Sequence, residues 1–339
     1  MKINVETRDG IIWNKDIVAL EIAKCMSTGD KLQIDLKSEG PDCKHIGLYD
    51  LLYMSAELFN YDLSKIDLYS CNALEKHDTI NIIFTPSLHL LDRELRKKYD
   101  FMSIKKNNQL KHFGRFIGRS NSPRLMLSTY LDNHYADKSI LTYQYKFNEE
   151  YHRREIGLEG LINDYNKKDI SSECKFLQSC PRQVVDIDFK FNKTTTDDFS
   201  SQLHLQENGK FIDVYRQFFV EIVSETYFSG NTFFLTEKIF RPILLKTPFI
   251  VQGPQWFLYN LKKLGFKTFD QWWDEGYSED PADYQPTEIQ KVIATLAALS
   301  VNQISTMYEE MQSILDFNQK RLLELTIDDF ANIGNNESF

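Results

Sequence analysis

Residues 218–253, FFVEIVSETYFSGNTFFLTEKIFRPILLKTPFIVQG, decide the fold that we expect for this chain. Residues 218–223 form a short apolar run rich in β-forming side chains, which is typical of a buried parallel strand. Thr236 stands at the N-cap position of a helix expected over residues 237–245, and residues 249–251 predict the next strand. The loop and the helix start of such a unit lie at the carboxyl edge of a sheet, where open α/β sheets bind ligands.

Within this stretch, residues 224–239 resemble the donor-binding motif of α-1,3-fucosyltransferases. In that family a glutamate at a strand end precedes an aromatic-rich loop and the tripeptide T-E-K. The resemblance implies that Glu237 and Lys238 hold a nucleotide sugar, with Lys238 on the diphosphate and Glu237 on the sugar or ribose. It also implies that Glu225 is the strand-end acid. Pro242 departs from the family pattern, and we expect it to remove a hydrogen bond and kink the helix.

Length and composition bound the class of protein. At 339 residues, with 42% hydrophobic and 13% aromatic side chains, the chain is long enough for two α/β domains. Its 40 basic and 49 acidic residues give a net charge of -9, which argues against non-specific coating of nucleic acid. Five cysteines without C-x-x-C spacing indicate reduced thiols. Because neither a signal core nor a transmembrane stretch is visible, we expect a cytoplasmic protein of a bacterial or phage-infected cell.

Alternating strand and helix patterns predict an α/β protein with two Rossmann-like domains. We expect an acceptor-side domain in residues 1–108 and a nucleotide-sugar donor domain in residues 109–310. Residues 311–339 are expected to form a C-terminal helix, which crosses back over the first domain, and a tail. Two such domains facing across a cleft describe the GT-B glycosyltransferase architecture. The expected strands outside the opening stretch lie at residues 31–36, 66–69, 80–84, 112–118, 139–145 and 266–269.

A basic run over residues 93–124 leads into the donor domain. The fucosyltransferase pattern implies that an arginine after the first strand of this domain grips the diphosphate, and Arg119 and Arg124 both fit that position. A planar guanidinium binds two phosphate oxygens at once, which suits this role. Lys238 and the helix dipole at Thr236 would add to the stabilisation of the leaving group.

A transfer that inverts the anomeric centre needs a base beside the acceptor hydroxyl, opposite the leaving group. We expect this base from the first domain. Glu39, in the loop after the strand at residues 31–36, is our choice because the resembling family places a glutamate base in that domain. Glu75 and Asp35 are the alternatives.

No metal site is expected. Asp186 and Asp188 form a D-x-D sequence, but they lie in an irregular region away from the proposed site. The basic groups are able to neutralise a diphosphate, so the reaction requires no cofactor beyond the nucleotide-diphosphate sugar itself. That the donor is a GDP-sugar is implied by the resemblance alone.

We therefore hypothesise an enzyme, a nucleotide-sugar-dependent glycosyltransferase that acts with inversion on a hydroxyl of a glycan or lipid-linked glycan. Two alternatives stay open. A phage-type DNA glycosyltransferase would modify hydroxymethylated cytosine and use the basic run of residues 93–124 as a DNA track, with strongly salt-dependent binding. A non-catalytic nucleotide- or glycan-binding protein would carry a degenerate site, and the presence of Glu237 and Lys238 counts against it.

Overall fold

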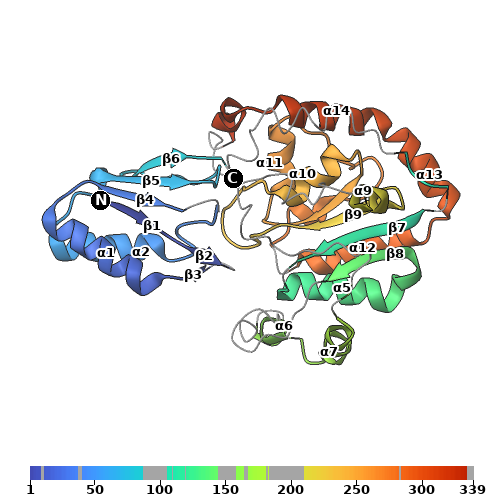
Figure 1. Ribbon diagram of the computed structural model, residues 1–339, viewed down its shortest axis with the longest axis horizontal. Coiled ribbons are helices and arrows are strands. Elements are labelled where there is room, and N and C mark those ends of the chain that lie inside the picture. Colours follow the sequence, from blue (N-terminus) through green and yellow to red (C-terminus); the bar gives the residue numbers. More distant parts are fainter. Residues whose placement is uncertain are drawn as a thin grey trace.

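The computed structural model describes residues 1–8, 11–36, 40–86, 105–108, 110–118, 120–143, 158–163, 167–180, 182, 210–281 and 284–333. Over these residues the fold is mixed α/β, with two separate four-stranded parallel sheets (Figure 1). The first sheet takes its strands from residues 2–84 and the second from residues 111–252. The expected α/β class is therefore confirmed. The boundary at residue 108 stays a prediction, because residues 87–104 lie outside the described part of the chain.

The strands of the first sheet follow the chain order, β1-β4-β5-β6. Right-handed crossovers that always step in one direction place their helices on one face, and α1 and α2 pack together there (Figure 1). Gly29 ends α1 with φ 73°, a left-handed conformation that glycine adopts without strain. The elements are β1 (Lys2–Asn4), β2 (Thr7–Arg8), β3 (Ile11–Ile12), α1 (Lys15–Thr28), β4 (Leu32–Asp35), α2 (Leu48–Phe59), η1 (Leu63–Lys65), β5 (Ile66–Ser70) and β6 (Asn81–Phe84).

The second sheet has the order β10-β9-β7-β8, so that the chain leaves its middle in two directions. The crossover from β7 steps outward to β8, whereas the crossover from β9 steps the opposite way to β10. The connecting helices α5 and α10 therefore cover opposite faces (Figure 1). The elements of this sheet are β7 (Lys111–Ile117), α5 (Ser122–Tyr135), η2 (Ala136–Lys138), β8 (Ser139–Tyr143), β9 (Phe218–Ser224), α10 (Glu237–Leu244) and β10 (Phe249–Gln252).

Further helices cover both faces of this sheet. α12 packs against α5 and β10 on one face, while α14 packs against α10 on the other (Figure 1). After α14 the chain reaches the first domain, where the ring of Phe330 lies 5.2 Å from that of Phe84 in β6. The remaining helices of the described residues are α6 (Leu158–Asn163), α7 (Ser171–Gln178), α9 (Lys210–Tyr215), α11 (Phe257–Lys263), η3 (Gly276–Ser278), α12 (Gln285–Ala297), α13 (Val301–Glu310), α14 (Gln312–Glu324) and η4 (Ile327–Asn332).

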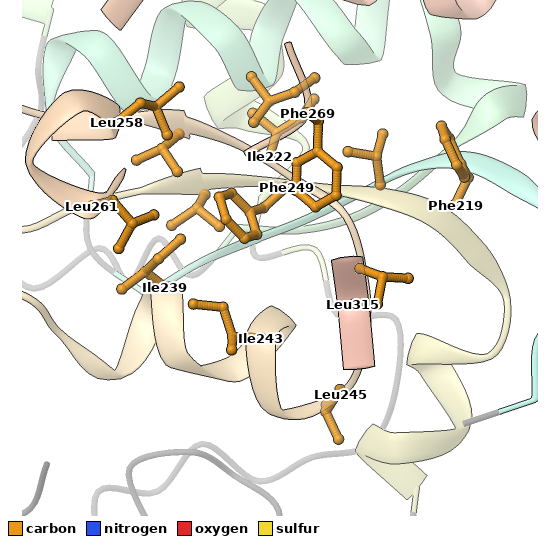
Figure 2. Packing of buried hydrophobic residues seen from close by; sticks show 14 of the residues in the cluster. Phe219, Ile222, Ile239, Ile243, Leu245, Phe249, Leu258, Leu261, Phe269 and Leu315 are labelled. Carbon is orange, nitrogen blue, oxygen red and sulfur yellow. The ribbon is translucent and has the colours of Figure 1, made fainter. Parts of the chain in front are cut away.

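Apolar packing holds α10 against the sheet. All residues of β9 are buried, as expected for a central parallel strand covered on both faces. Ile239 and Ile243, one helical turn apart, lie between α10 and the strand residues Ile222 and Phe249 (Figure 2). Burial of each such side chain contributes about 1.5–3 kcal/mol. The start of α10 is thereby held at the carboxyl edge of β9.

The strand expected at residues 266–269 is wrong. The structure contains no strand there. The backbone N–H and C=O of Lys267 are instead bound by the side chain of Asn318, each at 2.8 Å, and the N–H of Phe269 donates to Glu275 Oε1 at 2.8 Å. Side chains thus satisfy backbone groups that a neighbouring strand would otherwise bind.

Gly114 in β7 gives a test of this packing. A Cβ at Gly114 would lie 2.5 Å from Phe218 Cζ, and Phe218 is fully buried beside Phe116 and Tyr215. We expect Gly114→Ala to lower the free energy of unfolding by about 1–3 kcal/mol, measured by denaturant unfolding, because the ring has no room to move. Gly118→Ala is the control, since a Cβ there meets no atom of the described residues within 4 Å. Equal stabilities of the two variants would contradict the packing described.

Candidate functional site

The carboxyl ends of β7 and β9 form the switch point of the second sheet, because the chain leaves these neighbouring strands in opposite directions. Open α/β sheets bind ligands at such a point. The loop after β7 leads to α5, whose N-cap Asn121 accepts from the N–H of Arg124 at 3.1 Å. The loop after β9 runs to Thr236, the expected N-cap of α10, whose Oγ1 accepts from the N–H of Lys238 at 3.1 Å. The predicted cap is confirmed.

Thr236 also joins the cap to the strand-end acid. Its hydroxyl donates to Glu225 Oε2 at 2.5 Å. Glu225 is 1% exposed, and its Oε1 atom has no hydrogen-bond partner within the described residues. Burial raises the pKa of Glu225 to about 7, against the opposing effects of the Lys238 ammonium and the Thr236 hydroxyl. The site therefore contains a carboxyl group that titrates near neutrality.

Lys238 presents a positive charge at the start of α10. Its Nζ donates to Thr226 Oγ1 at 3.1 Å and pairs with Glu237 Oε1 at 2.7 Å, and a quarter (25%) of its side chain is exposed. Burial is the largest single effect and would raise the pKa of Glu237, but the Lys238 ammonium, the N–H of Glu237 and the Arg241 guanidinium together lower that pKa below its usual value. An ammonium with solvent access at the start of a helix, where the helix dipole is positive, is suited to bind an anion.

Arg124 lies at the same edge but is used within the protein. It is 6% exposed, its Nη2 donates to the carbonyl of Glu225 at 2.6 Å, and its guanidinium lies 5.7 Å from the centre of the Phe228 ring. Arg124 therefore ties the first turn of α5 to the loop after β9. Arg119, the other candidate, lies outside the described residues, and its role stays a prediction.

Arg115 lies beneath this edge, in β7. Sequence reasoning missed its structural role, because it counted Arg115 with the basic run. It is fully buried, and burial lowers its pKa to about 9. Its guanidinium donates to the carbonyls of Arg124 at 3.1 Å and Ile222 at 3.2 Å and to Gln252 Oε1 at 3.4 Å. The available signal was the position of this arginine within an apolar strand pattern.

The candidate bases of the first domain differ in their surroundings. Glu75 accepts from the Tyr49 hydroxyl at 2.6 Å and from the N–H of Cys43 at 3.0 Å, and burial raises its pKa. Asp35 forms an ion pair with Lys2 at 2.9 Å. Glu39 lies outside the described residues, as do Asp186 and Asp188. The role of Glu39 therefore stays a prediction.

Asn72 is a second residue that sequence reasoning missed. It follows β5, in a segment that the sequence identified only as an exit loop, and it is 2% exposed. Its side chain binds the loop between β9 and α10, which lies more than 150 residues further along the chain. The contact therefore brings the carboxyl edge of the first sheet to the candidate site of the second.

Comparison with models of protein families, with curated proteins and with solved structures found no match to this chain. Across the described residues, no helix combines the length and the apolar character needed to cross a membrane.

The buried Glu225 predicts a pH-dependent stability. Its pKa of about 7 in the folded protein exceeds the usual 4.5. Between these values the folded state holds more protons than the unfolded state, so the free energy of unfolding falls as pH rises, by roughly 3 kcal/mol for this group. The glutamine of Glu225→Gln does not ionise, so the free energy of unfolding of this variant should fall less as pH rises. Denaturant unfolding at about pH 5 and about pH 7.5 measures the difference. The same fall in both proteins would show that Glu225 ionises freely.

Proposed function

We propose that the protein is a glycosyltransferase that uses a nucleotide-diphosphate sugar. The observation that carries this proposal is the grouping of Glu225, Thr236, Glu237 and Lys238 around the start of α10, at the switch point of a parallel sheet. The fucosyltransferase resemblance assigns donor binding to Glu237 and Lys238 and identifies Glu225 as the strand-end acid, and Thr236 is the N-cap of the same helix. The GT-B architecture is part of the proposal, and the two parallel sheets are consistent with it.

The leaving group defines what the site has to do. When the acceptor hydroxyl oxygen bonds to the anomeric carbon, the bond from that carbon to the diphosphate breaks, and the diphosphate keeps the electron pair. Lys238 and the N–H groups of the first turn of α10 would stabilise this negative charge. Arg124 acts by holding the loop through the carbonyl of Glu225, while a direct contact with the diphosphate is proposed for Arg119. The nucleotide is proposed to be GDP on the resemblance alone.

The acceptor proposed is a hydroxyl of a glycan or lipid-linked glycan, in preference to DNA. Two arginines of the basic run, Arg115 and Arg124, are buried and unsuited to a DNA track. Other cations of the run line a groove of about 790 Å³ near the first residues of β7 and β9, at the edge of the sheet opposite Lys238. DNA held there would lie away from the proposed donor. The groove is lined by Lys105, Lys106 and Lys111 of the run and by Arg216, which lies outside the run.

Lys238→Ala tests the donor site. We expect the dissociation constant for the nucleotide-diphosphate sugar to rise tenfold or more, because a charged hydrogen bond of about 1.5–3 kcal/mol is lost. Calorimetry with GDP- and UDP-sugars measures it. Lys291→Ala is the matched control, since Lys291 also pairs with a glutamate (Glu288, 2.7 Å) but lies on α12. Unchanged affinity of the Lys238 variant for a donor that the wild type binds would reduce Lys238 to a surface residue.

The base is tested by turnover and binding together. Glu39→Gln should lower transfer to the acceptor by about 10²–10⁴-fold and leave donor affinity unchanged, because a base acts in the transition state and not in the ground-state complex. Asp35→Asn tests the second alternative: because Asp35 is held in an ion pair with Lys2, we expect this variant to transfer normally, and loss of transfer with intact donor affinity would make Asp35 the base. If Glu39→Gln is active and Glu75→Gln is inactive with donor affinity intact, the base is Glu75.

A further inference from the structure

The loop between β9 and α10, residues 225–236, is bound by the first domain. Asn72 Nδ2 donates to the carbonyl of Asn231 at 2.9 Å, and Asn72 Oδ1 accepts from the N–H of Phe233 at 2.9 Å. The N–H of Ala73 donates to the carbonyl of Phe233 at 3.0 Å. Asn72 and Ala73 of the first domain thus bind backbone groups of Asn231 and Phe233. The loop is held through its backbone, as a strand is held by its neighbour in a sheet.

Two glycines show how closely the domains approach. Gly230 has φ +81°, and a Cβ there would lie 2.8 Å from Asp42 Cβ of the first domain. Asp42 Oδ2 accepts from the N–H of the next residue, Asn231, at 2.8 Å. On the other side, a Cβ at Gly40 would lie 2.9 Å from Phe234 Cβ. A Cβ at Gly230 would push the loop away from the first domain, and a Cβ at Gly40 would clash both with the loop and with the N atom of Asn72, at 2.8 Å.

Asn72 is suited to this contact as few residues would be. Besides its bond to Phe233, its Oδ1 accepts from the N–H of Leu74 at 3.0 Å, and its Nδ2 lies 3.5 Å from Glu75 Oε2. The position of residue 72 therefore requires a side chain that donates on one side and accepts on the other. An asparagine side chain provides a donor and an acceptor in one group. Glutamine provides the same two groups but is longer by one methylene, so it would not reach the same partners without a shift of the loop.

We propose that Asn72 is a positioning residue for the donor site. It lies in the first domain and binds Phe233, three residues before Thr236, the residue that both caps α10 and holds Glu225. Displacement of the loop at Phe233, which is 1% exposed, would move Thr236 and with it the site around Lys238. Affinity for the donor thus depends on a side chain of the other domain. This inference rests on the proposed function.

Asn72→Ala tests the proposal with GDP and UDP as probes. We expect the dissociation constant of the nucleotide that the wild type binds to rise about tenfold, because two hydrogen bonds that order the loop are lost. Thr232→Val is a second variant, for the case that Asn72→Ala does not fold. It removes the hydrogen bond from Thr232 Oγ1 to the Gly40 carbonyl with little change in shape, and it should weaken binding in the same direction.

Asn318→Ala separates positioning from general stability. Asn318 is 1% exposed and, like Asn72, binds the backbone of a distant loop through both atoms of its amide, here to Lys267 at 2.8 Å each. We expect it to lower the free energy of unfolding about as much as Asn72→Ala, while nucleotide affinity stays within about twofold of wild type. Unfolding and calorimetry on the same preparations give both quantities.

The outcomes distinguish the two proposals. Suppose that the wild type binds a nucleotide and that Lys238→Ala weakens this binding. If Asn72→Ala and Thr232→Val then bind the nucleotide as the wild type does, the positioning role is wrong and the proposed donor site stands. If Asn318→Ala weakens binding as much as Asn72→Ala does, the effect of Asn72 is only structural and the inference is again overturned. If the wild type binds neither nucleotide, the proposed function fails, and the inference fails with it.

Discussion

The candidate site depends on the buried guanidinium of Arg115. A charged group in the interior is tolerated only when its N–H groups find acceptors. Arg115 extends from β7 and donates to carbonyls of Arg124 in α5 and Ile222 in β9 and to the side chain of Gln252 in β10. Because a guanidinium is planar and its donors have fixed directions, these elements have little freedom relative to one another at the carboxyl edge. The rigid edge then carries the loops that form the site.

Burial and the charge of Lys238 have opposite effects on the pKa of Glu225 at this edge. Glu225 is buried, which favours its neutral form, whereas the ammonium of Lys238 favours the ionised form, and the opposing effects leave its pKa near neutrality. A diphosphate placed beside Lys238 would add negative charge and favour the neutral form of Glu225 again. The same carboxyl group thus holds the cap through Thr236 and responds to the charge of what binds there. Perturbed carboxyl groups of this kind are frequent at functional sites.

The carboxyl edges of the two sheets are turned toward each other. Asp42 follows β4 and Asn72 follows β5, and both bind the loop that follows β9. Glu75, a candidate base, lies in the same exit loop as Asn72 and near its amide. A ligand bound at the carboxyl edge of the second sheet would therefore face side chains of the first domain. In the proposed transferase, one set of hydrogen bonds would serve both the shape of the donor site and the alignment of the acceptor side.

The sequence by itself determined the elements of this protein whose causes are local. The apolar run that became β9, the N-cap at Thr236 and the adjacent charges of Glu237 and Lys238 were readable because periodicity and capping act within a few residues. Only the tertiary structure decided that Arg115 and Arg124 are buried, that Glu225 titrates near neutrality, and that residues 266–269 bind side chains and form no strand. It also decided that Asn72 meets Phe233, 161 residues away. The burial of charged side chains, pKa values and strand pairing depend on which distant segments pack together, and a local pattern carries at most a partial signal of this, as the apolar strand around Arg115 does.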